Sequence, residues 1–420
     1  MYMIMRRATV FVGILIFFSI IYSLQYKNIP ISYYDEHDWI AKSYQAGYYG
    51  IKSDIWDSYQ AYDQPPLVGY VYNLFIKGTY LKNRLRGESY KDYLFRNNFL
   101  LFEGDKTPIP WGKVPEQVSH VSINRLEQMF GLEIRKTINI IFVVRKYNAI
   151  LWAINIAIVF LITQALSVGV IIGVIITILL GFNSLLSQYG LMAQSESIFL
   201  TLFNINILLF LILRHKKNLI WTSLLALFAA LLFQTKINGI MIYIFILMYF
   251  IWQKKWEKIA IYAISFIFSS ILLNPTLMHW DFLWRIYHYL EVRRAVQAGQ
   301  IRDYPISYIQ NVWQAFLLFF NHFFFETWQN HYNIALPNSL MYVFLFICWL
   351  VGIVKQWKKR PIFVIFFIWI FFITTLYLRL DWNRYWIHLT FFVYYFEIYG
   401  LFSIGQLIYK RVIAYLGRIR

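Results

Sequence analysis

The fold is decided by the stretch from Leu151 to Leu180, LWAINIAIVFLITQALSVGVIIGVIITILL, in which no residue carries a charge. A helix needs about 20 mostly apolar residues to cross the roughly 30 Å hydrocarbon core of a membrane, so this stretch predicts two crossings, over 149–166 and 168–187. The composition agrees, because 59% of the 420 residues are hydrophobic and only 14% are charged, against about 25% charged in an ordinary soluble domain. The sequence therefore predicts a protein that crosses a membrane several times.

Apolar windows of this kind recur along the chain. Read over about 19 residues, they predict an all-α, polytopic membrane helix bundle of about ten transmembrane helices: 8–25, 149–166, 168–187, 195–213, 218–235, 238–252, 258–274, 340–354, 361–379 and 385–405. When these spans are threaded, the clusters of Lys and Arg between them fall on one side: Arg6-Arg7, Arg214–Lys217, Lys254–Lys258, Lys355–Arg360 and Lys410-Arg411. Because cytoplasmic loops are enriched in such residues, we expect both termini on the cytoplasmic side of a cell (cytoplasmic) membrane.

Two segments are too polar to span, about 26–148 and about 275–339, and both face outward in this topology. The chain is therefore divided into a catalytic membrane module over 1–274, a second outer loop over 275–339 and C-terminal membrane helices over 340–420. The first outer loop holds 13 of the 21 carboxylates, so acidic chemistry is expected at the outer face. Amphipathic stretches in the two loops predict helices that lie in the membrane interface: Trp39–Tyr49, Leu67–Tyr80 and Val312–Phe325.

Several classes of function fit this composition poorly. Cys348 is the only cysteine and lies in an apolar run, so an intrachain disulfide is excluded and a cysteine-zinc cluster is not expected. The formal net charge of +18 comes from short clusters between apolar blocks, where orientation in the membrane explains it, and no nucleic-acid partner is expected. We find no internal repeat, which argues against a secondary transporter.

Acidic and proline-rich motifs stand just outside the first span. Asp35-Glu36 lies about ten residues beyond it, and Asp63-Gln64-Pro65-Pro66-Leu67 follows. The two prolines end one segment, and the apolar run after them begins another helix. The adjacent carboxylates also have a purely structural interpretation, because acids at a helix start favour the positive end of the helix dipole.

The order of these motifs resembles the C-type glycosyltransferases that use polyprenyl-phosphate sugars, a group with the GT-C fold that includes protein O-mannosyltransferases and lipid A aminoarabinose transferases. Members carry an Asp-Glu pair in the first outer loop, matched by Asp35-Glu36, and mannosyltransferases follow it with a His-Pro-Pro-Leu-Gly-like element, here Asp63–Gly69. Similar elements continue in order: Arg145 before the second span, Ser195-Glu196 at the start of the fourth, Thr235–Gly239 with Lys236, and Asn383-Arg384-Tyr385. Gln64 in place of His, an inserted Val68 and the short second outer loop leave the acceptor open.

This resemblance implies an enzyme that moves a sugar from a polyprenyl-phosphate-linked donor to a lipid, glycan or protein acceptor at the outer face, with inversion at the anomeric carbon. Asp35 is the expected general base, with Glu36 as the alternative or as its orienting neighbour. Substrate-binding residues are expected among Arg145, Glu196, Lys236, Arg384, Tyr385 and Asp63.

Charges at the ends of the predicted spans bear on this expectation. Lys236 and Arg384 are expected at the depth of a lipid phosphate, where a fixed cation binds it, although such side chains also reach the interface without a ligand. Arg379 is expected there too, with Asp381 as a simple pairing partner. Glu196 and Glu397 are the acids expected in or at apolar spans, where ionisable groups suggest function, and Glu196 either orients a sugar hydroxyl or holds Lys236.

Two other classes of function stay open. A lipid or solute transporter or flippase needs ionisable residues along the midplane, whereas the charge here lies in the outer loop. A non-catalytic membrane assembly partner tolerates the loss of Asp35 and Glu36. No cofactor is expected, since the histidines show no ligand spacing, and a divalent cation held by Asp35, Glu36 and an outer-loop histidine is the alternative.

Overall fold

The computed structural model describes most of the helical part of the chain: residues 2–29, 36, 39–40, 43, 66–84, 87–90, 92–93, 134–274, 277–278, 281–303, 305–326, 339–381 and 383–419. These residues contain helices and short turns but no strand, apart from one isolated bridge between Tyr308 and Leu380. The expectation of an all-α chain is confirmed over this part.

Long α-helices make up the bundle. They are α1 (Tyr2–Gln25), α4 (Leu67–Asn83), α7 (Ile134–Ala165), α8 (Val170–Gly181), α9 (Ser184–Leu191), α10 (Ser195–Leu213), α11 (Leu219–Phe233), α12 (Ile240–Trp252), α13 (Trp256–Leu273), α14 (Phe282–Asp303), α15 (Val312–Phe320), α17 (Ser339–Lys359), α18 (Pro361–Tyr377) and α20 (Thr390–Ile419). Short elements connect them: η4 (Ile237–Gly239), η6 (Pro305–Ser307), a π-helical turn η7 (Asn321–Glu326), α19 (Asn383–Trp386) and η8 (Ile387–Leu389).

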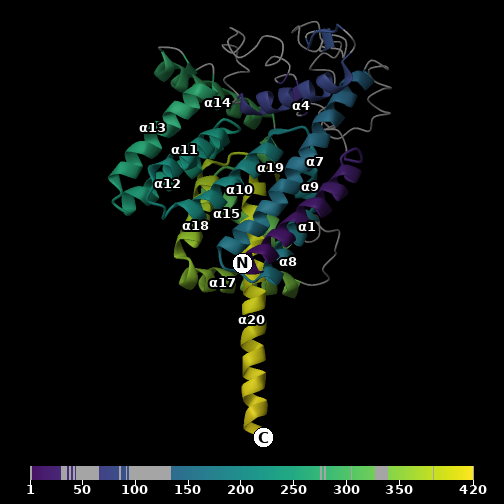
Figure 1. The fold of residues 1–420 in the computed structure, drawn as a ribbon. Helices are drawn as coiled ribbons and strands as arrows, with labels where there is room; N and C mark the ends of the chain where they lie inside the picture. Colours follow the sequence, from purple (N-terminus) through teal and green to yellow (C-terminus); the bar gives the residue numbers. More distant parts are fainter. Residues whose placement is uncertain are drawn as a thin grey trace.

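The bundle has two distinct ends (Figure 1). Helices α4 and α14 lie across one end, which we call the α4 end. The two ends of the chain lie toward the opposite end, which we call the termini end, and the last part of α20 continues beyond it as a single helix. Lys258 donates from Nζ to the carbonyl of Lys216, so two of the basic clusters that the sequence places on one side do lie together.

Membrane crossing is supported by length and composition. Six helices among the described residues are long and apolar enough to span, or seven if the bent pair α8 and α9 forms one span. Four more apolar helices are shorter: Leu219–Phe233, Ile237–Trp252, Val312–Phe324 and Pro361–Tyr377. Each of the ten windows expected from hydropathy coincides with a helix or with the bent pair, and the count of ten crossings stays a prediction.

The sequence suggested one straight helix over 168–187, but the structure has two helices there. Helices α8 and α9 meet at an angle of 66°. Asn183 accepts a hydrogen bond at 2.8 Å from the backbone N–H of Leu186 and so caps α9. The same side chain donates to the hydroxyl of Tyr394 in α20 at 3.1 Å. The helix breaks there because the Asn183 side chain replaces a backbone acceptor.

Polar side chains link neighbouring helices inside the apolar core. Asn204 of α10 donates to Asn155 of α7 at 2.8 Å, and Asn206 donates to the carbonyl of Phe228 in α11 at 3.0 Å. Such bonds are favoured in an apolar medium because each polar group needs a partner there. They restrain the rotation of α7, α10 and α11 about their axes.

The stretch Val312–Phe325 differs from the expected interfacial helix. Its first part is α15, and η7 follows directly. Phe319, Phe323 and Phe324 are almost fully buried and belong to the main core, where Phe319 meets the ring of Phe371 in α18 with 4.6 Å between centroids. One face of this helix therefore packs within the bundle, because aromatic side chains outnumber polar ones in this stretch.

Helices α17 and α20 touch through two glycines. A Cβ on Gly352 would lie 1.9 Å from the carbonyl oxygen of Phe396, and a Cβ on Gly400 would lie 1.7 Å from that of Cys348. Real Cβ atoms do not approach this closely, so only glycine lets the two backbones meet. This close approach is the small-residue contact that drives helix association in lipid.

Replacing Gly352 with Val is therefore expected to lower the free energy of unfolding by about 1–3 kcal/mol or more, the usual range for overpacking. Gly13→Val in α1, where nothing lies within 4 Å of the added Cβ, is the matched control and should change little. Denaturant unfolding in mixed micelles measures both. Equal stability of the two variants would contradict the close contact.

Candidate functional site

A buried ion pair anchors the segment that follows the first span. Arg145 of α7 donates from Nε to Glu36 Oε1 at 2.7 Å and from Nη2 to Oε2 at 2.5 Å, and neither side chain is exposed. Arg145 Nη1 donates to the carbonyls of Ile29 and Tyr26 at 2.6 and 3.2 Å. The backbone N–H of Ala193 donates to Glu36 Oε1 at 2.7 Å. The ion pair thus joins the end of α1 and α7 through Arg145, and the segment before α10 through Glu36.

This geometry gives Glu36 and Arg145 positioning roles. Both oxygens of Glu36 and all three nitrogens of Arg145 bond to the protein, so Glu36 is poorly placed as the alternative base and Arg145 as a substrate ligand. Asp35 and Asp63 lie outside the described residues, and their expected roles as general base and substrate ligand stay predictions. The pair holds the residue next to Asp35 in a fixed place, at the α4 end.

Helix α4 docks on the same region. Pro66 is its N-cap, and the N–H of Leu67 donates to the carbonyl of Gln234 at 3.2 Å. The hydroxyl of Tyr72 donates to the carbonyl of Gln194 and accepts from Asn148 Nδ2 at 2.9 Å. Burial, helped by the nearby carboxylates of Glu196 and Glu36, raises the pKa of the Tyr72 phenol well above its ordinary value. Tyr72 therefore stays a neutral donor between the two acidic side chains.

A tight turn presents Lys236. Thr235 donates from Oγ1 to the carbonyl of Leu232 at 2.6 Å, and the N–H of Gly239 donates to the carbonyl of Lys236 at 2.8 Å. A Cβ on Gly239 would lie 2.7 Å from the Leu232 carbonyl, so the turn requires glycine. The Lys236 ammonium lies 2.5 Å from Glu196 Oε1, with side-chain exposures of 22% and 2%. Of the two roles open for Glu196, the structure shows that it holds Lys236.

An aromatic row continues from this pair. Lys236 Nζ lies 5.7 Å from the centroid of the Phe199 ring, and the ring of His388 meets Phe199 edge-on at 6.4 Å. His388 Nε2 lies 2.8 Å from Thr374 Oγ1. Thr374 lines a large cavity, and so do Ile237 and Asn238, which directly follow Lys236. The ion pair therefore lies close to the cavity.

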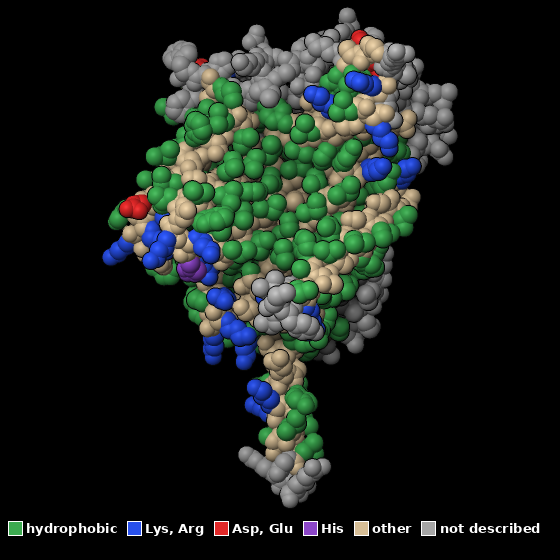
Figure 2. Space-filling view, viewed as in Figure 1, with side chains coloured by type: hydrophobic (Ala, Val, Ile, Leu, Met, Phe, Trp, Pro, Cys, Tyr) green, Lys and Arg blue, Asp and Glu red, His purple; other side chains and the backbone are tan. Residues whose placement is uncertain are grey.

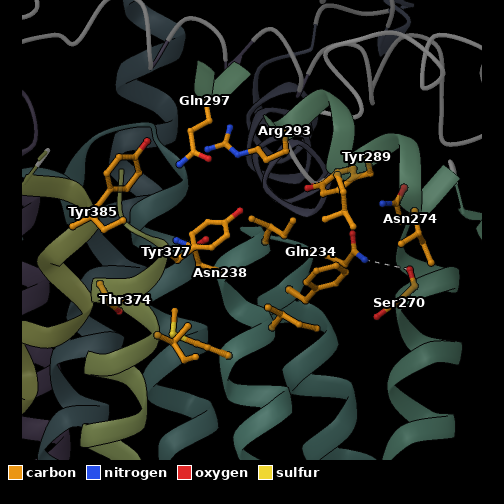
Figure 3. A pocket seen from close by; sticks show the side chains of 18 of the residues that line it. Gln234, Asn238, Ser270, Asn274, Tyr289, Arg293, Gln297, Thr374, Tyr377 and Tyr385 are labelled. Carbon is orange, nitrogen blue, oxygen red and sulfur yellow. Dashed lines mark hydrogen bonds between the residues drawn. The ribbon is translucent and has the colours of Figure 1, made fainter. Parts of the chain in front are cut away.

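The cavity has a volume of about 470 Å³, within the roughly 300–1,000 Å³ of small-molecule sites. It is enclosed by α11, η4, α12, α13, α14, α18 and the residues up to Tyr385. Figure 3 shows Arg293 and Gln297 of α14 at the upper rim, with Tyr377 and Tyr385 on one side. The site is therefore assembled from helices that are distant in the sequence.

The cavity is apolar in depth and polar at its rim. Side chains such as Met241, Phe266 and Ile373 line its apolar part. Within the described chain, the buried Gln234 Oε1 and Ser270 Oγ have no hydrogen-bond partner. Buried polar atoms of this kind are normally satisfied by water or a ligand, so both are available to a bound molecule.

Two arginines line the cavity. Arg293 comes from α14, and Arg379 follows α18 and is itself exposed. The expected pairing partner of Arg379 is bound elsewhere, because Asp381 Oδ1 lies 2.7 Å from His322 Nε2 and accepts from Trp386 Nε1 at 3.1 Å. The expected ion pair between Asp381 and Arg379 is therefore not among the contacts of Asp381.

The predicted site residues after α18 divide into two groups. Tyr385 lines the cavity. Arg384 lies over the ring of Tyr385, with 5.5 Å from its guanidinium carbon to the centroid, and is not one of the lining residues. Sequence reasoning missed Arg293 and Gln297, which belonged to the second outer loop. Their spacing of four on one helix face was the available signal.

Metal binding has no support from the described part of the chain, where no group of three or more His, Cys, Asp or Glu side chains is placed to hold an ion. A cation held by Asp35, Glu36 and an outer-loop histidine stays a prediction, because Asp35 lies outside the described residues. Glu397, the other acid expected within a span, is buried in α20, and neither of its oxygens bonds to another described group.

A scan against models of protein families gives no match for this chain. A search of curated proteins gives none either.

Loss of the Arg145 guanidinium is expected to lower the free energy of unfolding by about 3–5 kcal/mol, because Arg145→Met leaves the Glu36 carboxylate buried without its counterion. The double variant Arg145→Met with Glu36→Gln should recover part of this loss. Denaturant unfolding in mixed micelles gives the values.

The control for that experiment is Arg285→Met. It removes the pair between Arg285 and Asp281, at 2.8 Å and partly exposed, which is worth about 0–1 kcal/mol. If Arg145→Met were no more damaging than Arg285→Met, the anchoring role of Arg145 would be wrong.

Proposed function

We propose that this protein is a membrane glycosyltransferase, which moves a sugar from a polyprenyl-phosphate donor to an acceptor at the α4 end, taken as the outer face. The observation that carries the proposal is the cavity beside the Glu196–Lys236 pair, apolar in depth with two arginines at its rim. A molecule with an apolar chain and an anionic head matches this division. The motif order of the sequence agrees with it.

The apolar part of the donor has a route of entry. Side chains of α13 and α18 that line the cavity are also exposed, among them Ile267 (51%) and Tyr377 (50%). Exposed apolar residues on a membrane helix face lipid, so the cavity adjoins the hydrocarbon between α13 and α18. A polyprenyl chain therefore reaches it without passing through water.

The anionic part of the donor meets a positive rim. Arg293 and Arg379 line the cavity, and Lys236 lies next to its wall. Guanidinium groups bind phosphate oxygens in a charge-assisted and often bidentate way. The same cations stabilise the negative charge that grows on the phosphate as it leaves.

The chemical step is a single displacement at the anomeric carbon. The acceptor hydroxyl loses its proton to the carboxylate of Asp35 as its oxygen bonds to that carbon, and the bond to the donor phosphate breaks with its electron pair going to the phosphate. The configuration inverts. The Glu36–Arg145 pair supports this proposal because it fixes the chain next to Asp35.

Asp35→Asn is expected to lower the turnover number by about 10²–10⁴-fold, the usual contribution of a general base, with the protein still folded. The measurement is sugar transfer from a synthetic polyprenyl-phosphate sugar in nanodiscs. Asp92→Asn is the matched control, because Asp92 lies in the same loop and its exposed carboxylate accepts local hydrogen bonds from Ser89. Unchanged turnover in Asp35→Asn would rule out the assigned base.

Arg379→Gln is expected to raise the KM for the donor about tenfold, since a hydrogen bond to a charged group is worth about 1.5–3 kcal/mol, and to change kcat less. Arg294→Gln is the control. It removes an exposed charge next to Arg293 on α14, outside the cavity lining, and should leave the KM for the donor unchanged. A donor titration with both variants decides the point. Equal KM values would contradict phosphate binding at this rim.

A transporter or flippase remains the second candidate, because the same cavity also suits lipid movement. Proteoliposomes loaded with labelled donor separate the two. Glycosylated product without net lipid movement supports the enzyme, and lipid movement without product supports the transporter. A non-catalytic assembly partner gives neither.

A further inference from the structure

Cations from separate loops converge at the termini end of the bundle. We call the following residues the basic cluster: Arg214, His215 and Lys216 after α10, Lys255 and Lys258 at the start of α13, and Arg360 before α18. Lys258 donates to the carbonyl of Lys216, and Arg360 donates from Nη2 to Ser167 Oγ at 3.2 Å. Figure 2 shows basic side chains around a histidine at the lower left of the molecule.

The turn between α12 and α13 is shaped to bring its lysines there. Lys254 has a φ of +54°, a left-handed conformation that is uncommon for a residue with a side chain. The N–H of Lys255 donates to the carbonyl of Phe250 at 3.0 Å, which closes the turn. Lys258 then lies over the Phe250 ring, with 5.6 Å to the centroid. The strained backbone at Lys254 thus precedes a helix start at which the Lys258 side chain is buried.

Arg214 is, with Lys258, one of the two buried members of the basic cluster. It is 6% exposed, and its Nη1 has no hydrogen-bond partner among the described residues. Its Nε donates to His215 Nε2 at 2.9 Å, which requires that this imidazole nitrogen carry no proton. An unpaired donor on a buried guanidinium is costly. The site therefore favours a bound hydrogen-bond acceptor, which the described chain does not supply.

The charges around this donor do not balance. Partial burial lowers the pKa of the His215 imidazole, and the charges that lower it further are all positive: Arg214, Lys255, Lys258 and Arg360. Glu257 is the only acid in the three basic loop segments of the sequence, and it is exposed in the first turn of α13. Like charges held this close repel one another, and a bound anion relieves that repulsion.

The surroundings of the basic cluster favour an anion with acyl chains. Exposed apolar side chains flank it at the ends of α10, α12 and α13, among them Ile212, Trp252 and Trp256. Tryptophan is enriched where a membrane meets water. A free phosphate would leave these side chains uncovered, whereas a phospholipid covers them with its chains and places its phosphate at their level.

We propose that the basic cluster binds the phosphate of an anionic phospholipid in the leaflet at the termini end, with Arg214 Nη1 donating to a phosphate oxygen. Lys255, Lys258 and Arg360 supply the surrounding positive charge. The site lies at the opposite end of the bundle from the proposed donor cavity and does not depend on the proposed function.

The test is native mass spectrometry of the full chain from nanodiscs made of phosphatidylglycerol and phosphatidylcholine in equal parts. The unmodified protein should retain phosphatidylglycerol in preference to phosphatidylcholine. Arg214→Gln and Lys255→Gln should each weaken that retention about tenfold, as expected for losing one charge-assisted hydrogen bond. Lys410→Gln on the projecting part of α20 removes the same charge at the same end and should change nothing.

Three outcomes overturn the proposal. The first is equal retention of the two lipids by the unmodified protein. The second is a loss in Lys410→Gln as large as in Lys255→Gln, which would indicate general attraction to the surface. The third is displacement of the lipid by inorganic phosphate at millimolar concentration, which would identify a site for free phosphate. Because Lys255 is only partly buried, its variant keeps the test valid if Arg214→Gln fails to fold.

Discussion

A single buried guanidinium holds the α4 end of this protein together. Arg145 carries its charge inside the bundle, where the Glu36 carboxylate and two backbone carbonyls accept hydrogen bonds from it and stabilise it. In such surroundings an unpaired charge would cost several kcal/mol. The chain after the first span therefore has to pass close to α7, and this constraint fixes the place of Glu36 relative to the rest of the bundle.

The remaining charged side chains at the α4 end fall into two groups: some bond to other protein groups, and others line the cavity. Glu196 restrains Lys236, and Asp381 is taken up by His322 and Trp386. Arg379 lines the cavity, away from the contacts that hold Asp381. A cavity that is apolar in depth, with guanidinium groups at its rim, suits an amphiphile whose head is anionic. The opposite end of the bundle also gathers cations, among which Arg214 is buried with Nη1 unpartnered within the described residues.

Much of the architecture could be predicted from hydropathy, because a helix that crosses lipid must be apolar over its whole length. The position of each window needs only local composition, and each one coincides with a helix or with the bent pair. Side-chain interactions between distant residues decided the exceptions. Asn183 breaks the third window because Tyr394 and a free backbone N–H both bind it. Phe319 is buried because α18 offers it an aromatic partner.

The sequence by itself determined that the chain has the apolar helices of a membrane protein, with most of its acids in one loop, since apolar length and charge position are properties of neighbouring residues. Motif order also pointed to Glu196 and Lys236, which do meet. Only the tertiary structure decided that Glu36 faces Arg145, that Arg293 and Arg379 share a cavity, and that Arg214 is buried among cations. Those outcomes depend on which helices lie side by side and on how each is rotated, and packing sets both.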